Sequence, residues 1–264
     1  MNSSDEIKKV VKDKYAEIAV KNTGCGCGCN TNSNVVEFSM FQDDYSKFDG
    51  YVPEADLGLG CGAPTEFAGI KEGHTVLDLG SGAGNDVFVA HSLVGESGKV
   101  IGVDMTPEMI EKANKNKKKL GYQNIEFKLG EIDQLPINKE VIDVVISNCV
   151  LNLVPDKSAA FSEIYRVLKP GAHFCVSDIV VEGKLPEGLQ KSAEMYAGCV
   201  SGALQKDEYL KIIESNGFTN IEIMKSKEIK LPDEILTQYL DESEIAEFKK
   251  NNIGIFSITV VGYK

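Results

Sequence analysis

A glycine-rich segment that begins and ends with an acid, DLGSGAGND at 78–86, is the part of this 264-residue sequence best suited to holding a ligand. Gly80, Gly82 and Gly84 follow an apolar run and let the backbone approach a ligand that any Cβ atom would exclude. Twenty residues after Gly84, Asp104 ends the next apolar run, where a carboxylate can accept both hydroxyls of a ribose. The spacing predicts a nucleoside-binding loop, and a tight turn in an unrelated α/β fold is the alternative.

The position of Asp78 inside the turn distinguishes between two kinds of nucleoside cofactor. Dinucleotide-binding loops have the spacing G-x-G-x-x-G and direct a helix N-terminus at a pyrophosphate, which a carboxylate would repel. The same carboxylate suits the cationic sulfonium and ammonium groups of S-adenosylmethionine. The loop resembles motif I of the Rossmann-like methyltransferases, and this resemblance implies a ribose acid at Asp104 and an adenine site near residues 130–132. The predicted cofactor residues are Asp78, Gly80, Ser81, Gly82, Gly84, Asp86, Asp104, Met105, Gly130, Glu131, Ile132 and Asn148.

Three of the seven cysteines lie in separate segments that a fold could bring together: Cys61, Cys149 and Cys199. An odd number of scattered cysteines favours reactive or ligand thiols over a disulfide framework. Cys149 follows a predicted strand, and ligands of open α/β sheets bind beyond the carboxyl ends of the strands. Three thiolates with no histidine or carboxylate beside them select soft centres such as trivalent arsenic, whereas zinc usually takes a fourth ligand and closer spacings.

Over nearly its whole length the sequence resembles the arsenite methyltransferases, which methylate As(III) with S-adenosylmethionine. The resemblance implies that Cys61, Cys149 and Cys199 bind arsenic, with Cys149 and Cys199 holding methylated intermediates. It also implies that no general base is needed, because arsenic carries no proton, and that thiols return the electrons lost on methylation. The most specific blocks are PEADLGLGCGAPT at 53–65, DLGSGAGND at 78–86, GVDMT at 102–106, SNCVLNLVPDK at 147–157 and YAGCVSGAL at 196–204.

A further run of thiols, Cys25, Cys27 and Cys29, lies on a glycine-spaced loop that could reach Cys61. We interpret them as resolving thiols that thioredoxin or a small thiol reduces again. The single-residue spacing differs from the paired cysteines of the family, which leaves the identity of the resolving thiol open. A metal-scavenging tail without catalytic importance is the alternative.

Other candidate residues are better explained by structure than by chemistry. Cys175 lies in an alternating strand pattern and is expected in the core, and His74, His91 and His173 show no ligand spacing. The lysine-rich stretch at 112–119 reads as a solvated helix face. Two rival functions remain: methylation of a small organic acceptor on the same fold, and non-catalytic binding of a metalloid by thiols.

The elements that must position these residues alternate between strand and helix. Apolar runs predict strands at 74–79, 99–103, 125–129, 141–147, 174–177, 221–229 and 255–263. Helical spacing predicts helices at 4–21, 86–93, 106–120, 158–168, 189–204, 206–216 and 233–250. The helix at 158–168 should stop at Lys169-Pro170-Gly171, and the segment 233–250 should be a solvent-facing excursion. The alternation predicts an α/β fold: the Rossmann-like, doubly wound, mostly parallel sheet of a class I methyltransferase.

We therefore predict three regions: an N-terminal helix and Cys-rich arm at 1–34, a Rossmann-like cofactor domain at 35–180, and a C-terminal α+β region at 181–264 that binds substrate and extends the sheet. The net charge of −12 excludes nucleic acid and anionic membrane surfaces as favoured partners. No apolar stretch approaches the roughly 20 residues that span a bilayer, and the charged N-terminus is unlike a signal peptide. A cytoplasmic enzyme with arsenite or its thiol conjugates as substrate is expected.

Overall fold

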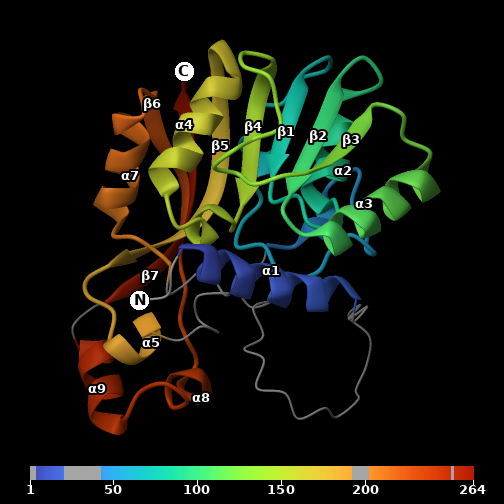
Figure 1. Ribbon diagram of the computed structural model, residues 1–264. Coiled ribbons are helices and arrows are strands. Elements are labelled where there is room, and N and C mark those ends of the chain that lie inside the picture. Colours follow the sequence, from blue (N-terminus) through green and yellow to red (C-terminus); the bar gives the residue numbers. More distant parts are fainter. Residues whose placement is uncertain (1–3, 21–42, 192–201, 251–252) are drawn as a thin grey trace.

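Seven strands form one mixed sheet at the centre of the computed structural model, which describes residues 4–20, 43–191, 202–250 and 253–264 (Figure 1). Their order across the sheet is β3-β2-β1-β4-β5-β7-β6. The first five run parallel, whereas β7 is antiparallel to both of its neighbours. The strands are β1 (Thr75–Leu79), β2 (Lys99–Asp104), β3 (Ile125–Leu129), β4 (Ile142–Asn148), β5 (Leu168–Glu182), β6 (Thr219–Glu228) and β7 (Gly254–Tyr263).

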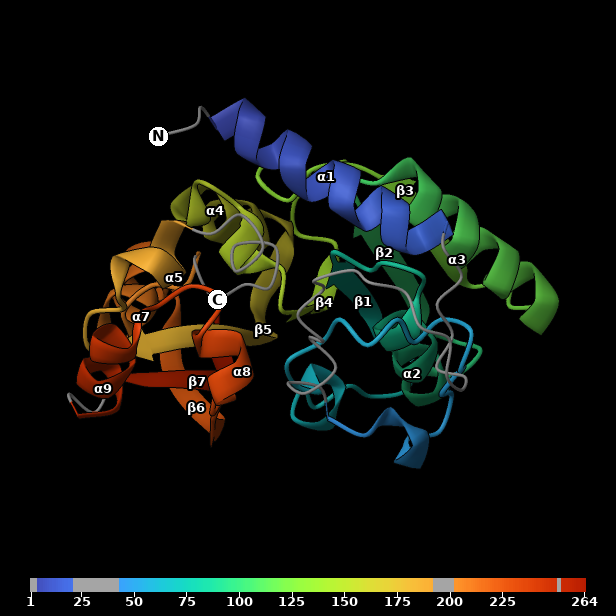
Figure 2. The same ribbon diagram turned by 90° about the horizontal axis from the view of Figure 1, so that it is seen from below.

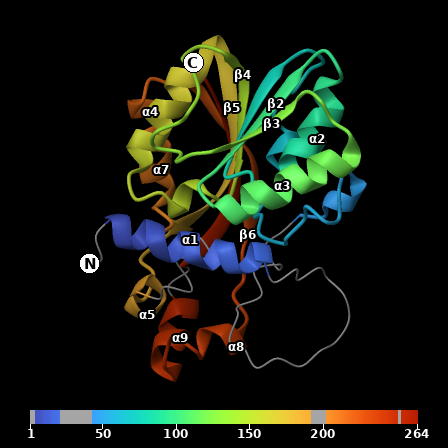
Figure 3. The ribbon, with the colours of Figure 1, turned by 45° about the vertical axis from the view of Figure 1, so that its right-hand side comes forward.

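Helices cover both faces of the sheet, with α4 and α7 on one side and α2 and α3 on the other (Figure 3). Successive residues of β1 pack on opposite faces of the sheet. Leu77 belongs to the same apolar core as Phe161 of α4, and Val76 belongs to the same core as Phe88 of α2. The predicted doubly wound α/β fold is confirmed. The helices are α1 (Ser4–Val20), α2 (Asn85–Val94), α3 (Pro107–Leu120), α4 (Lys157–Val167), α5 (Glu187–Lys191), α7 (Lys206–Ser215), α8 (Asp233–Leu236) and α9 (Glu242–Lys250), with 3₁₀ turns η2 (Tyr45–Lys47), η3 (Pro64–Glu66) and η4 (Leu151–Leu153). None of the described helices is long and apolar enough to cross a membrane.

The N-terminal helix α1 lies across the carboxyl ends of the parallel strands, next to α3 (Figures 1 and 2). Val11 is its most buried side chain, and Lys8 forms ion pairs with Glu131 and Asp133 in the loop after β3. The Lys8 Nζ to Asp133 Oδ2 distance is 2.8 Å. This helix therefore covers the edge of the sheet at which α/β proteins bind ligands.

Strand β5 is much longer than the sequence predicts. Helix α4 ends at Val167, and the strand begins at once at Leu168 and runs through the Pro-Gly pair to Glu182. The pairing of β4 with β5 shifts register between Ile142 and Val144, which is how the ladder passes the proline that cannot donate a hydrogen bond. The predicted stop of the helix near Lys169-Pro170-Gly171 agrees with the end of α4 at Val167. The same three residues also belong to the first part of β5.

The segment 233–250 is not wholly a solvent-facing excursion, so that prediction is wrong in part. It forms two short helices, α8 and α9, joined by a turn. Leu236 and Leu240 are buried and pack in one apolar cluster with Ile229, Leu231 and Ile255. The predicted helix at 189–204 overlaps α5 at its start, and residues 192–201 lie outside the described chain. Residues 202–204 are not helical, so the predicted end of this helix is wrong.

Candidate active site

A pocket opens at the carboxyl ends of the neighbouring strands β1 and β4. Chain connections leave in opposite directions at this point of the sheet, which is the usual ligand position in open α/β folds. All of the predicted cofactor residues except Gly84 line it. Gly84 instead supports the loop, because a Cβ atom there would lie 2.8 Å from the Phe88 ring and 3.0 Å from the Phe127 ring.

The glycine loop leaves room for a ligand at Gly82. Gly80 and Gly82 have φ angles of 67° and 51°, which favour glycine. A Cβ atom on Gly80 would lie 2.4 Å from the Val150 side chain, whereas one on Gly82 would meet nothing within 4 Å. The Gly82 amide donates to Asp104 Oδ2 at 2.9 Å, and the Thr106 amide donates to Asp104 Oδ1 at 2.8 Å. The backbone thus holds the Asp104 carboxylate in place at the end of β2.

Two buried carboxylates, Asp78 and Asp86, and the half-buried carboxylate of Asp104 line the pocket together. Burial, with the charges of Asp86 and Asp104, holds the pKa of Asp78 well above its ordinary value. Burial also raises the pKa of Asp104, and it raises the pKa of Asp86 to about 6 although Tyr45 and Asn148 donate hydrogen bonds to it. Burial and mutual repulsion make it unfavourable for these acids to ionise on their own. A positively charged ligand would offset both effects, so the cluster favours a cation.

Two buried polar atoms at the pocket lack a hydrogen-bond partner among the described residues: Ser81 Oγ and Asn85 Oδ1. Buried polar groups are nearly always hydrogen-bonded, because an unmade bond costs about 1–3 kcal/mol. A bound ligand with donors and acceptors of its own would satisfy both. The open space at Gly82, the acid cluster and these two atoms therefore fit a polar, positively charged nucleoside.

Cys61 and Cys149 meet beside this pocket, as the sequence predicted they could. Cys149 follows β4 and lines the pocket, and its amide donates to the carbonyl of Ser177 on β5 at 2.7 Å. Cys61 lies on the segment before η3, where its amide donates to Asn148 Oδ1 at 3.0 Å. Both thiols are buried, and none of the described cysteines is in a disulfide. Cys199, Cys25, Cys27 and Cys29 lie outside the described residues.

A carboxylate also lies beside the two thiols, which corrects the prediction that none would. The Sγ atoms of Cys61 and Cys149 and a carboxylate oxygen of Asp178 all lie within 4.8 Å of one another. Asp178 is buried, and burial raises its pKa to about 7 while the charge of Lys157 acts in the opposite direction. Tyr209 of α7 donates to its Oδ2 atom at 3.2 Å.

Comparisons with known proteins identify the fold and the family. Residues 70–217 match the profile of a family described as a methyltransferase domain. The chain belongs to this methyltransferase family. It is 41% identical to the arsenite methyltransferase of Halobacterium salinarum over 85% of this chain and 60% of that protein. It is 36% identical to the arsenite methyltransferase of Aquipseudomonas alcaligenes over 70% of this chain and 55% of that protein.

Among solved structures, the methyltransferase resembles the arsenic(III) S-adenosylmethionine methyltransferase of Chlamydomonas reinhardtii. The two are 38% identical with a TM-score of 0.63, and the match covers 75% of this chain and 65% of that one. The chain therefore spans less than two-thirds of the length of each of these relatives. These matches confirm the predicted class I fold, the resemblance to arsenite methyltransferases and, at the level of the family, an S-adenosylmethionine-dependent methyltransferase.

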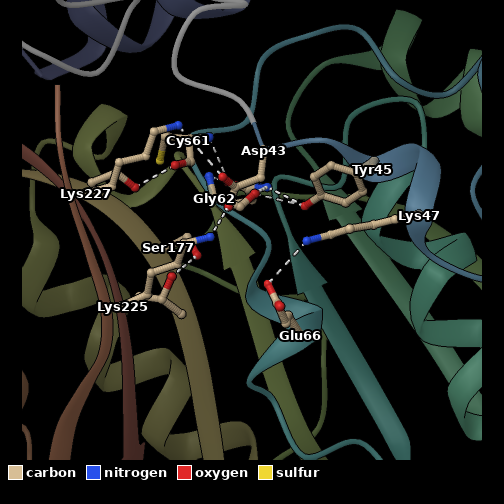
Figure 4. Close-up of polar contacts among 12 residues, drawn as sticks. Asp43, Tyr45, Lys47, Cys61, Gly62, Glu66, Ser177, Lys225 and Lys227 are labelled. Carbon is tan, nitrogen blue, oxygen red and sulfur yellow. Dashed lines mark hydrogen bonds and ion pairs between the residues drawn. The ribbon is translucent and has the colours of Figure 1, made fainter. Parts of the chain in front are cut away.

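Sequence reasoning missed a network that joins the two parts of the methyltransferase site. Tyr45 is buried, and its hydroxyl lies 2.7 Å from Asp86 Oδ1. The same hydroxyl lies 3.1 Å from the carbonyl oxygen of Gly62 (Figure 4). Asn148 donates to the Gly62 carbonyl and accepts from the amides of Cys61 and Gly62. The segment that carries Cys61 is thus fixed to the first turn of α2. An aromatic residue in an aperiodic segment gave no signal of this role.

Replacing Tyr45 with phenylalanine is expected to lower the free energy of unfolding by about 1–2 kcal/mol, since Asp86 and Asn148 lose a buried hydrogen-bond partner. Urea unfolding followed by circular dichroism measures this change. Tyr263→Phe is the matched control, because Tyr263 is exposed and its substitution should change stability by less than about 0.5 kcal/mol. Equal stabilities of the two variants would contradict a structural role for the Tyr45 hydroxyl.

The residues set aside on sequence grounds have structural surroundings in the methyltransferase. Cys175 is buried on β5, and its thiol lies 3.2 Å from the Pro64 carbonyl oxygen. The pKa of this thiol is raised far above its ordinary value by burial, which leaves it unreactive. His91 contacts the Asn124 side chain at 2.8 Å and His173 contacts the Ala68 carbonyl at 2.7 Å, so both side chains join loops to the fold.

Proposed function

We propose that this methyltransferase transfers a methyl group from S-adenosylmethionine to trivalent arsenic held by cysteine thiolates. The observation that carries the proposal is the meeting of Cys61 and Cys149 beside the pocket that the glycine loop lines. Thiolates are soft donors and suit a soft acceptor such as As(III). The relatives named arsenite methyltransferases, in an archaeon and a bacterium, support the same substrate.

The residues of the pocket fit the methyl donor. When bound, S-adenosylmethionine supplies an electrophilic methyl group on a positively charged sulfur. Asp104, with both oxygens held by backbone amides, would accept the ribose hydroxyls, and the loop at Gly130, Glu131 and Ile132 would hold the adenine. Asp78 and Asp86 would favour the positive charge. Gly82 gives the ligand room where any side chain would intrude.

The surroundings of the two thiols are mostly apolar, with the buried carboxylate of Asp178 as an exception. Cys61 and Cys149 belong to a buried cluster with Val11, Leu153 and Ile179. Such walls exclude water from bound arsenic, and the thiolates fix its position toward the methyl donor. Cys199 as the third thiolate, and Cys25, Cys27 and Cys29 as thiols that resolve a disulfide and are reduced by thioredoxin or a small thiol, are parts of the proposal that rest on the sequence.

The test is direct. Purified protein with S-adenosylmethionine, arsenite and a small dithiol should form S-adenosylhomocysteine and methylated arsenicals in matching amounts, measured by chromatography coupled to arsenic detection. S-adenosylhomocysteine formed only when an organic acceptor is added would favour the rival enzyme. Arsenite binding without any S-adenosylhomocysteine would favour a non-catalytic thiol protein.

The acid cluster predicts a pH dependence of donor binding. The positive sulfonium favours ionised carboxylates, and Asp86 ionises at a pH of about 6. We expect the affinity for S-adenosylmethionine to fall by about tenfold between pH 7 and pH 5, as measured by isothermal titration calorimetry. S-adenosylhomocysteine, which lacks the sulfonium charge, should show a smaller decrease. Parallel pH profiles for the two ligands would contradict charge recognition by these acids.

The raised pKa of Asp86 also makes the stability of the ligand-free protein depend on pH. Asp86 has a folded pKa of about 6 against an ordinary value of 3.8. The native state therefore binds protons more tightly, and this carboxylate destabilises the fold progressively as the pH rises through that interval. Below that pH interval Asp86 is protonated in both the folded and the unfolded state, and the destabilisation is absent. The methyl donor should remove part of the penalty above pH 6, so its stabilisation of the fold against heat should be larger at pH 7 than at pH 5.

A further inference from the structure

The register of the sheet places an acid opposite one of the two arsenic-binding thiols. Asn148 pairs with Ser177 across β4 and β5, so the next residues, Cys149 and Asp178, are neighbours at the end of the same ladder. Cys61 reaches them from the segment that Ser257 of β7 holds through a hydrogen bond to the Cys61 carbonyl. One carboxylate and two thiols thus meet within 4.8 Å in the interior of the protein.

The contacts of Asp178 leave part of its carboxylate available. Among the described residues, three donors reach it: the Ile179 amide at 3.0 Å from Oδ1, the Tyr209 hydroxyl at 3.2 Å from Oδ2, and the Asn152 backbone amide. A carboxylate has about four acceptor positions, so these donors fill three of them. Lys157, a buried ammonium that donates to two carbonyls of the η4 turn region, supplies the opposing charge. One oxygen of the same carboxylate lies within 4.8 Å of both thiol sulfur atoms.

We propose that Asp178 is a substrate-positioning residue whose carboxylate accepts a hydrogen bond from the hydroxyl that As(III) keeps when Cys61 and Cys149 alone have bound it. This inference rests on the proposed function. Arsenous acid has three hydroxyls, and two thiols replace two of them: two As–S bonds form, two As–O bonds break, and each thiol proton leaves with a hydroxide as water. Arsenic stays trivalent, and no electrons move. The third hydroxyl remains and faces Asp178.

The inference predicts a selectivity that a purely structural role would not give. Methylarsonous acid also exchanges two hydroxyls for two thiols, but it then carries a methyl group in place of the last hydroxyl. Asp178 should therefore strengthen the binding of arsenite and leave the binding of methylarsonous acid nearly unchanged. A carboxylate that only supported the fold would affect both arsenicals alike.

The experiment uses the full chain with Cys199→Ser, so that arsenite keeps its third hydroxyl, and measures binding of each arsenical by equilibrium dialysis. Adding Asp178→Asn should weaken arsenite binding by about tenfold, because a charge-assisted hydrogen bond becomes a neutral one, and should change methylarsonous acid binding by less than about twofold. Tyr209→Phe is the matched control: it removes one contact to the same carboxylate but keeps the acceptor. It should leave the ratio of the two affinities unchanged.

A second measurement needs no change at Asp178. The Cys199→Ser protein should prefer arsenite over methylarsonous acid by about tenfold more than dithiothreitol does, since the small dithiol has no carboxylate. An equal preference, or an equal loss of both arsenicals in Asp178→Asn, would overturn the role of Asp178 and leave the proposed function standing. Failure of the Cys199→Ser protein to bind either arsenical would overturn the inference, because Cys61 and Cys149 would then not hold arsenic without Cys199. Methylation of arsenite by the parent chain tests the proposed function separately.

Discussion

Cys149→Ser is expected to lower the rate of arsenite methylation by at least about a hundredfold, because a hydroxyl is a hard donor that does not replace a thiolate on a soft centre. The serine side chain is close in size to cysteine and fits a position that is only 4% exposed. Cofactor binding should persist, since the glycine loop and Asp104 are unchanged. Product formation by chromatography and S-adenosylhomocysteine binding by calorimetry measure the two effects separately.

The backbone conformation at Cys149 supports the hypothesis that its thiol binds a ligand. Its φ angle is 59°, and among the described non-glycine residues only Glu140 and Asn220 share a positive φ. A cysteine in this region costs about 1 kcal/mol or more, and such strain is found most often at ligand sites. The strained turn leads the chain from β4 into η4 and places Cys149 at the pocket, with its thiol close to that of Cys61.

Cys175→Ser is the matched control for Cys149→Ser. It makes the same exchange at a buried thiol on the neighbouring strand, and the new hydroxyl can also donate to the Pro64 carbonyl. This variant should methylate arsenite at close to the parent rate. Activity close to the parent rate in both serine variants would contradict a ligand role for Cys149. An equal loss of activity in both would point to a general effect of polar substitution in the core.

The cofactor half of the site could be predicted from sequence because its residues are local. Asp78, the three glycines and Asp104 lie at strand ends, and short-range patterns locate strand ends well. Gly121 ends α3 in the left-handed conformation that a helix-stopping glycine implies. The loop and the parallel sheet together determine where these side chains meet.

The substrate half could be predicted only in part, because it depends on contacts between distant segments. Asp178 carries the same signal as Asp104, an acid directly after an apolar strand run, but this signal alone does not indicate that the acid lies beside a thiol. The segment that carries Cys61 has no periodicity. Its position is set by side chains from far along the chain, such as Lys225 of β6, whose Nζ lies 2.7 Å from Asp43 Oδ2 (Figure 4). No local pattern encodes such a pair.

Gly82→Ala is expected to weaken binding of S-adenosylhomocysteine by at least about tenfold while leaving the protein folded. The φ angle of 51° at Gly82 disfavours alanine by about 1 kcal/mol, and the added Cβ meets no protein atom within 4 Å. The methyl group therefore enters the pocket itself, beside the amide that holds Asp104. Calorimetric titration measures the affinity, and thermal unfolding measures the stability.

Gly121→Ala separates the effect of the pocket from the effect of backbone strain. Gly121 has a φ angle of 76°, and a Cβ atom there also meets nothing within 4 Å, but it lies at the end of α3 and does not line the pocket. Both alanine variants should lose about 1 kcal/mol of stability, and only Gly82→Ala should lose cofactor affinity. Equal affinities in the two variants would mean that the cofactor does not approach the loop at Gly82. A deficit confined to Gly82→Ala would support a ligand that contacts the backbone at Gly82, because backbone strain at a left-handed glycine is common to both variants.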